Sequence, residues 1–402
     1  MVATPTATPF PACSSRPCPT AIPSLLGYYS QIKDPRSAQG RRHSLPSLLA
    51  LATAAMLCGV RGYQPVAQWA RDHPDELLRD LGFVPGRTPC GATLHTVFKR
   101  LDWTQVAEQL HAWAAVVMQA LTPGRPPELD ALALDGKTLR GSRTQQAEIT
   151  HMVSVVSHRL GLTLAQEGVA TAGEEPTVVE AVLRSVFLEG RVVTVDALHT
   201  RHEVAKQIVG SGGDYLMTVK KNQPYLLEDL KALFAPHHAA DQDRQSHTTR
   251  ERGHGRMEER WLLAVSLSPD DRETLGWPGA AQIFVVERKV SRGGTKGRKH
   301  SRALVYGITS LPRERAGAEE LLRLNRGHWS IENRSHWVKD VVLGEDASQV
   351  ASGKIARILA ALRSTVLNLV RAERAPNVAA RLRRIAARPA EGLTLLGLRT
   401  EN

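Results

Sequence analysis

Apolar residues recur at helical spacing through the first quarter of the chain. Leu48, Leu51, Ala52 and Ala55 fall on one face of a helix predicted over residues 45–60. The same spacing predicts further helices over three stretches: 63–78, 93–101 and 104–121. We therefore expect an N-terminal helical domain over residues 25–122. The pattern alone does not separate a small DNA-binding domain from a helical packing domain.

The pattern changes after a linker at 123–128 (PGRPPE), which is rich in Pro and Gly. Short apolar runs typical of strands follow at 131–134, 151–158, 162–170, 191–195 and 214–219. The second and third runs form a predicted hairpin around Gly161, and helices are predicted over 176–188 and 200–209. This alternation predicts an α/β fold with a mixed sheet covered by helices.

Residues 225–320 are less regular, with strands predicted at 261–266, 282–290 and 303–309. A glycine-rich basic tip, residues 291–302 (SRGGTKGRKHSR), separates the last two strands. One helix then runs through Glu332, and a final helix over 355–374 precedes an arginine-rich tail (Arg381, Arg383, Arg384 and Arg388). We expect the basic tip and this tail to make salt-sensitive phosphate contacts.

Charge narrows the choice of partner. The 402 residues carry a formal net charge of +12, with a pI of about 9.8, which favours a polyanionic partner. The best apolar run, 45–60, is shorter than a membrane span and contains Pro46, so a buried helix is expected there. Residues 1–24 are rich in Pro, Thr and Ala and lack the pattern of a signal peptide, which predicts a disordered tail. The four cysteines form no Cys-x2-Cys pair, so we expect reduced thiols in a cytoplasmic protein.

Two aspartates directly follow apolar strands. Asp135 ends LALD and Asp196 ends VVTVD. Carboxylates at the rim of an open α/β sheet lie where such sheets bind ligands, and neighbouring strands would bring the two together. Hard oxygen ligands suit the paired Mg²⁺ or Mn²⁺ ions of phosphodiester chemistry. The alternative, that each aspartate merely caps a turn or helix, is favoured for either residue taken alone.

A third carboxylate, Glu332, lies in GHWSIENRSHWVKDVVLGEDAS. On a helix it would share one face with His328, His336 and Lys339. A solvent-exposed charged face is one alternative. A zinc site formed by His328, Glu332 and His336 is another, but it would leave the two aspartates unexplained.

The same segment holds two tryptophans, Trp329 and Trp337. Exposed tryptophan beside basic residues suits stacking on unpaired bases. Tryptophan suits a hydrophobic core equally well, and core packing is the favoured interpretation.

Taken together, these segments resemble the DDE transposases of bacterial insertion sequences, a group that includes the H-repeat-associated proteins. The matching stretches follow the family's order: LALDGKTLRGS, VVTVDALHT, GGDYLMTVKKNQ, RGHGRMEER and the segment around Glu332. The helical stretch LLALATAAMLCGVRGYQPVAQWA also resembles the family's N-terminal associated domain. LALDGKTL is similar to the start of haloacid-dehalogenase phosphatases as well, but Ala133 stands where their nucleophilic aspartate would be.

The resemblance implies an RNase H-like mixed sheet flanked by helices. Asp135 would end the first strand, Asp196 the fourth, and Glu332 would lie on a helix after the fifth. The implied domains are a tail (1–24), the N-terminal helical domain (25–122), a catalytic core (128–224 and 320–350), a β-rich insertion (225–319), and a C-terminal helix with a basic tail (351–402).

The resemblance also implies the chemistry of the site. Asp135, Asp196 and Glu332 would be catalytic and would hold divalent ions, Mg²⁺ or Mn²⁺, two in number. Many relatives carry Tyr-x2-Arg-x3-Glu-x6-Lys around the glutamate, and this chain has Asn325 and His328 in place of the Tyr and Arg. The residues expected to support the site or contact DNA are Lys137, Arg140, Lys220, Asn222, His328, Asn333, His336 and Lys339.

The function implied is cleavage at the ends of an insertion sequence and strand transfer into target DNA. Double-stranded DNA would be the partner and the protein would act as a homodimer on it, in the cytoplasm and at the nucleoid. A nuclease with the same core but no strand transfer, and an inactive or domesticated DNA-binding protein, are the alternatives.

Overall fold

A computed structural model describes residues 22–124, 129–140, 150–169, 175–235, 243–253, 256–292, 299–348, 350 and 352–399. Three predictions fall wholly or largely outside these residues: the disordered tail, most of the linker at 123–128, and the centre of the basic tip.

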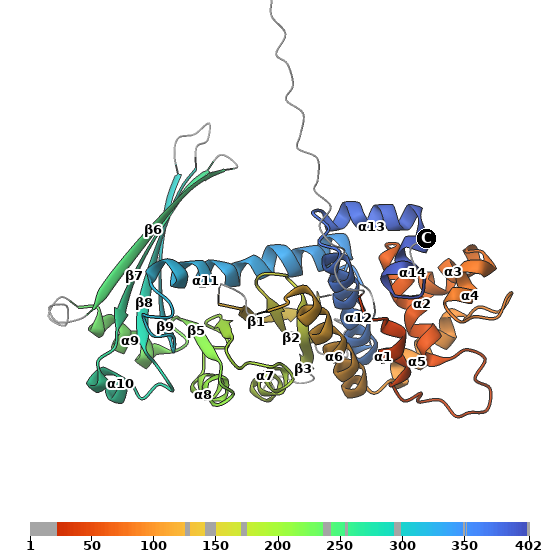
Figure 1. Cartoon of the computed structure of the whole chain (residues 1–402), viewed down its shortest axis with the longest axis horizontal. Coiled ribbons are helices and arrows are strands. Elements are labelled where there is room, and N and C mark those ends of the chain that lie inside the picture. The colour runs from red at the N-terminus through yellow and green to blue at the C-terminus, as the bar shows by residue number, and fades with distance from the viewer. Residues whose placement is uncertain are drawn as a thin grey trace, which may run out of the picture.

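The N-terminal part is helical, as predicted, and lies at one end of an elongated molecule (Figure 1). Trp113 and the apolar face around Leu48 are fully buried. The helix expected over 63–78 is split in two at Pro74, which cannot continue the first helix. Within the described residues, no helix is long and apolar enough to cross a membrane. The helices are α1 (Leu25–Ser30), α2 (Leu45–Leu57), α3 (Tyr63–Asp72), α4 (Asp75–Asp80), α5 (Gly91–Arg100) and α6 (Trp103–Leu121).

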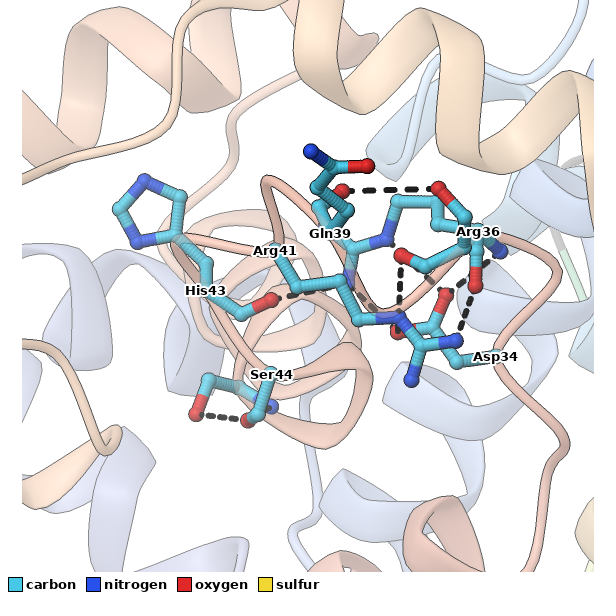
Figure 2. Close-up of polar contacts among 8 residues, drawn as sticks. Asp34, Arg36, Gln39, Arg41, His43 and Ser44 are labelled. Carbon is cyan, nitrogen blue, oxygen red and sulfur yellow. Dashed lines mark hydrogen bonds and ion pairs between the residues drawn. The ribbon is translucent and has the colours of Figure 1, made fainter.

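The loop between α1 and α2 is organised around one carboxylate, as Figure 2 shows. Asp34 accepts hydrogen bonds from the backbone amide and the guanidinium of Arg36, and that guanidinium also donates to the His43 carbonyl at 2.8 Å. The Ser44 hydroxyl then caps α2 by accepting from the Ser47 amide at 3.1 Å. These bonds fix the direction in which the buried helix α2 starts.

In the part of the chain that the structure describes, nine strands form one sheet in the order β3-β2-β1-β4-β5-β9-β8-β7-β6. β1, β4 and β5 pair in parallel, and every other neighbouring pair is antiparallel. This confirms the predicted mixed α/β sheet and the hairpin around Gly161. The first five strands are β1 (Ala131–Thr138), β2 (His151–Ser157), β3 (Thr163–Val169), β4 (Val192–Val195) and β5 (Asp214–Val219).

The two faces of the sheet are covered by different helices. Leu132 and Val193 belong to the large core that also contains residues of α7 (Glu175–Arg184) and α8 (His202–Gly210). Ala131 and Val192 belong instead to the cluster that contains the leucines of α11 (Ala318–Ile331). Since alternate residues of a strand point to opposite faces, Asp135 and Asp196 point to the α11 face, along with Ala131 and Val192.

The edge strand β3 is covered by side chains from two helices. The His111 Nε2 in α6 accepts a hydrogen bond from the Gln166 amide at 2.9 Å. Asn368, in α12 (Gly353–Ala372), accepts from the Thr163 amide at 2.9 Å and donates to the Thr163 carbonyl at 2.8 Å. Backbone groups that would otherwise offer a template for another strand are thereby occupied.

The predicted β-rich insertion extends the same sheet. β9 pairs with β5, so the strands of the insertion continue the core sheet and project from it as a curved arm (Figure 1). Three of its strands were predicted, though shorter, and β6 was not. The elements are α9 (Pro224–Leu233), β6 (Arg244–Gly253), β7 (Arg256–Ser266), α10 (Pro269–Leu275), β8 (Gln282–Arg292) and β9 (Lys299–Thr309).

The arginine-rich tail forms α13 (Val378–Ala387) and leads into α14 (Pro389–Leu395). Arg381 makes a two-pronged ion pair with Glu373, at 2.7 and 2.8 Å, and also pairs with Glu391. Arg384 lies 3.1 Å from the same Glu391 carboxylate. Part of the positive charge expected to meet phosphates is thus balanced within the chain.

Candidate metal centre and active site

Strand register places the two aspartates beside each other. The parallel pairing of β1 with β4 ends at Leu134 opposite Val195, so the next residues along the two strands are Asp135 and Asp196. β1 continues to Thr138 by pairing with β2, so Asp135 lies within a strand and not after its end. Both aspartates are partly buried on the sheet face that α11 covers.

The surroundings of Asp135 act on its charge in opposing directions. Burial raises the pKa of its carboxyl, the neighbouring His336 and His328 lower it, and the charge of Asp196 raises it again, leaving the pKa above its usual range. The Gly136 amide donates to Asp135 Oδ1 at 2.8 Å. A cation at this position would offset both the cost of burying the Asp135 charge and the repulsion between the two aspartates.

The loop that carries Asp196 is held at both ends. Asp196 Oδ1 accepts hydrogen bonds from the amides of Leu198 and His199, at 3.1 and 3.2 Å. The Thr200 hydroxyl lies 2.8 Å from the Asp196 carbonyl and 2.7 Å from the Thr218 carbonyl at the end of β5. These contacts fix the aspartate with respect to two strands of the sheet.

Residues of the TVKKNQ segment lie next to this loop. Asn222 donates its side-chain amide to the Ala197 carbonyl, and Gln223 donates to the Thr200 carbonyl at 2.9 Å. Lys220 is exposed. Of the two residues expected here to touch DNA, Asn222 therefore supports the Asp196 loop and Lys220 presents its charge to solvent.

Glu332 lies at the junction between an α-helix and a π-helical segment. α11 ends at Ile331, and the chain continues as two π-helical segments, η3 (Glu332–His336) and η4 (Val338–Val342). The Trp337 amide bonds to the Glu332 carbonyl five residues earlier, where an α-helix would use the carbonyl four residues earlier. π-helical turns are rare and often lie at functional sites.

Glu332, Asp135 and His336 form a group of possible metal ligands. One ligand atom from each lies within 4.8 Å of the others. Contact with the His336 ring, opposed by burial, lowers the pKa of the Glu332 carboxyl. The Glu332 side chain is 62% exposed, so solvent reaches the group. Two carboxylates and an imidazole are a donor set that fits a divalent cation.

His328 has a different environment from His336, although sequence spacing placed both on one face with Glu332. Its Nδ1 lies 3.0 Å from the Thr194 hydroxyl, which is also 2.8 Å from His158 Nε2. Burial lowers the pKa of His328, and the charges of Asp135 and Asp196 oppose that effect. Among the described residues, the possible ligand group contains His336 but not His328, which is not the arrangement of the zinc alternative.

Lys137 and Lys339, expected to support the site or contact DNA, are both buried. Lys137 pairs with Asp340 and lies 2.7 Å from Glu345 Oε2. Burial opposes the charge of Glu345, but Lys339, Lys137 and Arg363 outweigh it and lower the pKa of Glu345. Asp340 and Glu345, two other acids of the segment around Glu332, therefore face cations.

The remaining predicted residues lie at the surface. Arg140 and Asn333 are exposed. Trp329 and Trp337 are 61% and 55% exposed, so the prediction that they pack in a core is wrong. Trp329 lies in α11, and Trp337 lies between the two π-helical segments.

The comparison with protein families matches most of the chain. Residues 126–369 match the family described as Transposase DDE domain, and residues 26–114 match a second one, described as DDE_Tnp_1-associated. The chain belongs to the DDE transposase family. The two matches cover the helical domain and the sheet that carries Asp135, Asp196 and Glu332.

Individual relatives match between about two thirds and nine tenths of the chain. The protein YncI of Escherichia coli O157:H7, provisionally named a transposase, is 28% identical over 87% of this chain and 88% of its own length. The H repeat-associated protein YhhI of E. coli K12, with the same provisional name, is 25% identical over 87% and 90%. A protein from the dhlA 3′ region of Xanthobacter autotrophicus is 31% identical over 68% and 91%.

Several residues of this region were not singled out from the sequence. Thr194 precedes Asp196 by two positions, so strand alternation could have placed it on the same face. His158 and Arg363 gave no local signal, because their partners lie on other elements. Glu345 lies close to Glu332 in the sequence, but its contacts with Lys137 of β1 and Arg363 of α12 could not be predicted from its own segment.

Proposed function

We propose that the protein is a DNA transposase that cleaves the ends of its insertion sequence and joins them to target DNA. Asp135, Asp196 and Glu332 are its catalytic carboxylates. The proposal rests on one observation above all. Strand register sets Asp135 beside Asp196, and the π-helical turn brings Glu332 into the same ligand group as Asp135. Family membership supports the same assignment.

The reaction consists of two phosphoryl transfers. In the first, a water oxygen bonds to phosphorus as the bond from phosphorus to the 3′ oxygen breaks, which leaves a free 3′-OH. In the second, that 3′ oxygen bonds to a target phosphorus and displaces another 3′ oxygen. Two divalent cations, Mg²⁺ or Mn²⁺, would activate the attacking oxygen and stabilise the leaving oxygen when bound by the carboxylates.

The chain itself supplies positioning. Asp135 is fixed by the β-ladder and the Gly136 amide, and Asp196 by its braced loop. His328, held by Thr194, lies close enough to both aspartates for their charges to oppose the effect of burial on its pKa. Pre-organised groups of this kind cost no reorganisation during the reaction.

The test uses three near-isosteric variants of the full chain: Asp135→Asn, Asp196→Asn and Glu332→Gln. Each should lose cleavage of duplex DNA carrying the element's ends, by at least about a hundredfold, because charge stabilisation at the reacting oxygens is lost. End binding, measured by gel shift, should remain. Glu180→Gln, on α7 at the opposite face of the sheet, is the matched control and should cleave normally.

Two further outcomes decide between the proposal and its alternatives. Precut ends with a free 3′-OH should join to target DNA; cleavage without joining would indicate a nuclease. Full cleavage by all three variants would overturn the carboxylate assignment, and absence of cleavage by the unaltered chain would indicate an inactive DNA-binding protein.

A further inference from the structure

The roles proposed for the three carboxylates do not explain why His336 lies between two of them. It follows Glu332 by four residues on η3, and its Nδ1 lies 3.6 Å from Glu332 Oε2 and 3.6 Å from Asp135 Oδ2. These separations exceed the 2.7–3.2 Å of an ordinary N–H···O hydrogen bond. The ring nitrogen therefore faces two carboxylate oxygens at equal distance without forming a close bond to either.

The ring is also not held as a core histidine would be. Its side chain is more than nine-tenths buried, and Nε2 is buried without a hydrogen-bond partner among the described residues. Because no hydrogen bond at Nε2 orients the ring, its recorded ion-pair contacts are the two at Nδ1, on the side of the carboxylates.

We propose that His336 Nδ1 is a nitrogen ligand of the metal ion held by Asp135 and Glu332. This rests on the proposed metal-dependent function and adds a fourth residue to its centre. An imidazole nitrogen is a softer donor than a carboxylate and suits transition metals, whereas Mg²⁺ strongly prefers oxygen. The centre should therefore favour Mn²⁺ over Mg²⁺ more than carboxylates alone would.

The decisive variant is His336→Asn. Its amide oxygen can take the place of Nδ1, one bond beyond Cγ, so an oxygen donor replaces the nitrogen and the ion is still held. Because the oxygen donor suits Mg²⁺ better than a nitrogen donor does, the ratio of Mn²⁺ to Mg²⁺ affinity should fall by about tenfold, the lower end of the affinity changes seen when the surroundings of a metal are altered. Calorimetric titration of the full chain without DNA measures both affinities.

Pulsed electron paramagnetic resonance of bound Mn²⁺ gives an independent readout. The unaltered protein should show coupling of the ion to a ¹⁴N nucleus, and His336→Asn should bind Mn²⁺ without that coupling. His151→Asn, an exposed histidine on β2, is the matched control and should retain it. His336→Gln serves as a second variant, and far-ultraviolet circular dichroism checks that each protein is folded.

The outcomes are separable from those of the proposed function. Bound Mn²⁺ without ¹⁴N coupling in the unaltered protein, or coupling that persists in both His336 variants, would overturn the ligand assignment even if cleavage is normal. No Mn²⁺ binding by the unaltered chain would overturn it as well. Failure of the proposed function would appear separately, as cleavage that does not depend on Asp135, Asp196 and Glu332.

Discussion

Glu345 carries a buried negative charge among cations from three elements: Lys137 of β1, Lys339 of η4 and Arg363 of α12. Lys137 follows Asp135 by two residues on the same strand face, so this cluster links the strand that carries Asp135 to the helix that follows Glu332. From the family resemblance, Lys339 was expected to support the site or to contact DNA. Its burial could not be predicted locally, because the compensating charges are supplied by remote residues.

Replacing Glu345 by Gln should therefore destabilise the fold. It leaves Lys137, Lys339 and Arg363 without their central counter-charge, and breaking a buried ion pair costs about 3–5 kcal/mol. Urea unfolding at neutral pH measures the change. Glu391→Gln removes a partner of Arg381 and Arg384 that is 23% exposed, and it should cost less, about 1 kcal/mol. Equal effects of the two substitutions would contradict the prediction.

Helix α6 and strand β3 show that the apolar pattern of the sequence predicts single helices and strands better than the contacts between them. Both were expected from their apolar periodicity, and both are present. Their contact through His111 and Gln166 was not expected, since it depends on which strand ends the sheet. β6 was missed for a related reason. Its sequence, RQSHTTRERG, is almost entirely polar, and it is a strand because β7 pairs with all ten of its residues.

Burial of His111 makes the stability of the fold depend on pH. Burial lowers the pKa of His111 from 6.5 to about 4, so the unfolded chain takes up a proton first as the pH falls. The contribution of neutral, buried His111 to the free energy of unfolding is therefore complete above pH 6.5, and it declines as the pH falls below that value. At about 1.4 kcal/mol per pH unit, the loss between pH 7 and pH 5 is about 2 kcal/mol.

His111→Gln tests this expectation. The amide oxygen can accept the Gln166 bond and does not titrate, so the variant should lose about 2 kcal/mol less than the unaltered protein between these two pH values. Urea unfolding at pH 7 and pH 5 gives the comparison, in which the other titrating groups cancel. Parallel pH profiles of the variant and the unaltered protein would show that His111 is not responsible.

At the scale of the whole molecule, the arm and the core share one surface. Leu262 and Phe284 pack in the cluster that contains the α11 leucines, so Arg256 and Arg292, further along the same strands at even spacing, lie on that face too. The sequence predicted an insertion with a basic tip. That its strands join the core sheet could not be predicted, because the register of β5 with β9 relates residues about 90 positions apart.

If DNA lies along this face, these two arginines should contact phosphates. The double substitution Arg256→Gln and Arg292→Gln should reduce the slope of log affinity against log salt by about two, close to one unit for each lost phosphate contact. Filter binding from low to physiological salt measures the slope. Arg184→Gln with Lys206→Gln, on α7 and α8 at the opposite face, should leave it unchanged. An unaltered slope in the arm variant would exclude this face from the contact.

The shared strand β5 has a mechanical consequence. One of its edges is bonded to β4, which leads into Asp196, and the other to β9 of the arm. The arm and the strand that leads into Asp196 are therefore joined by backbone hydrogen bonds and not by a linker, so we expect them to move together. A force that a long, rigid DNA duplex exerts on the arm would reach Asp196 through two strands only, β5 and β4.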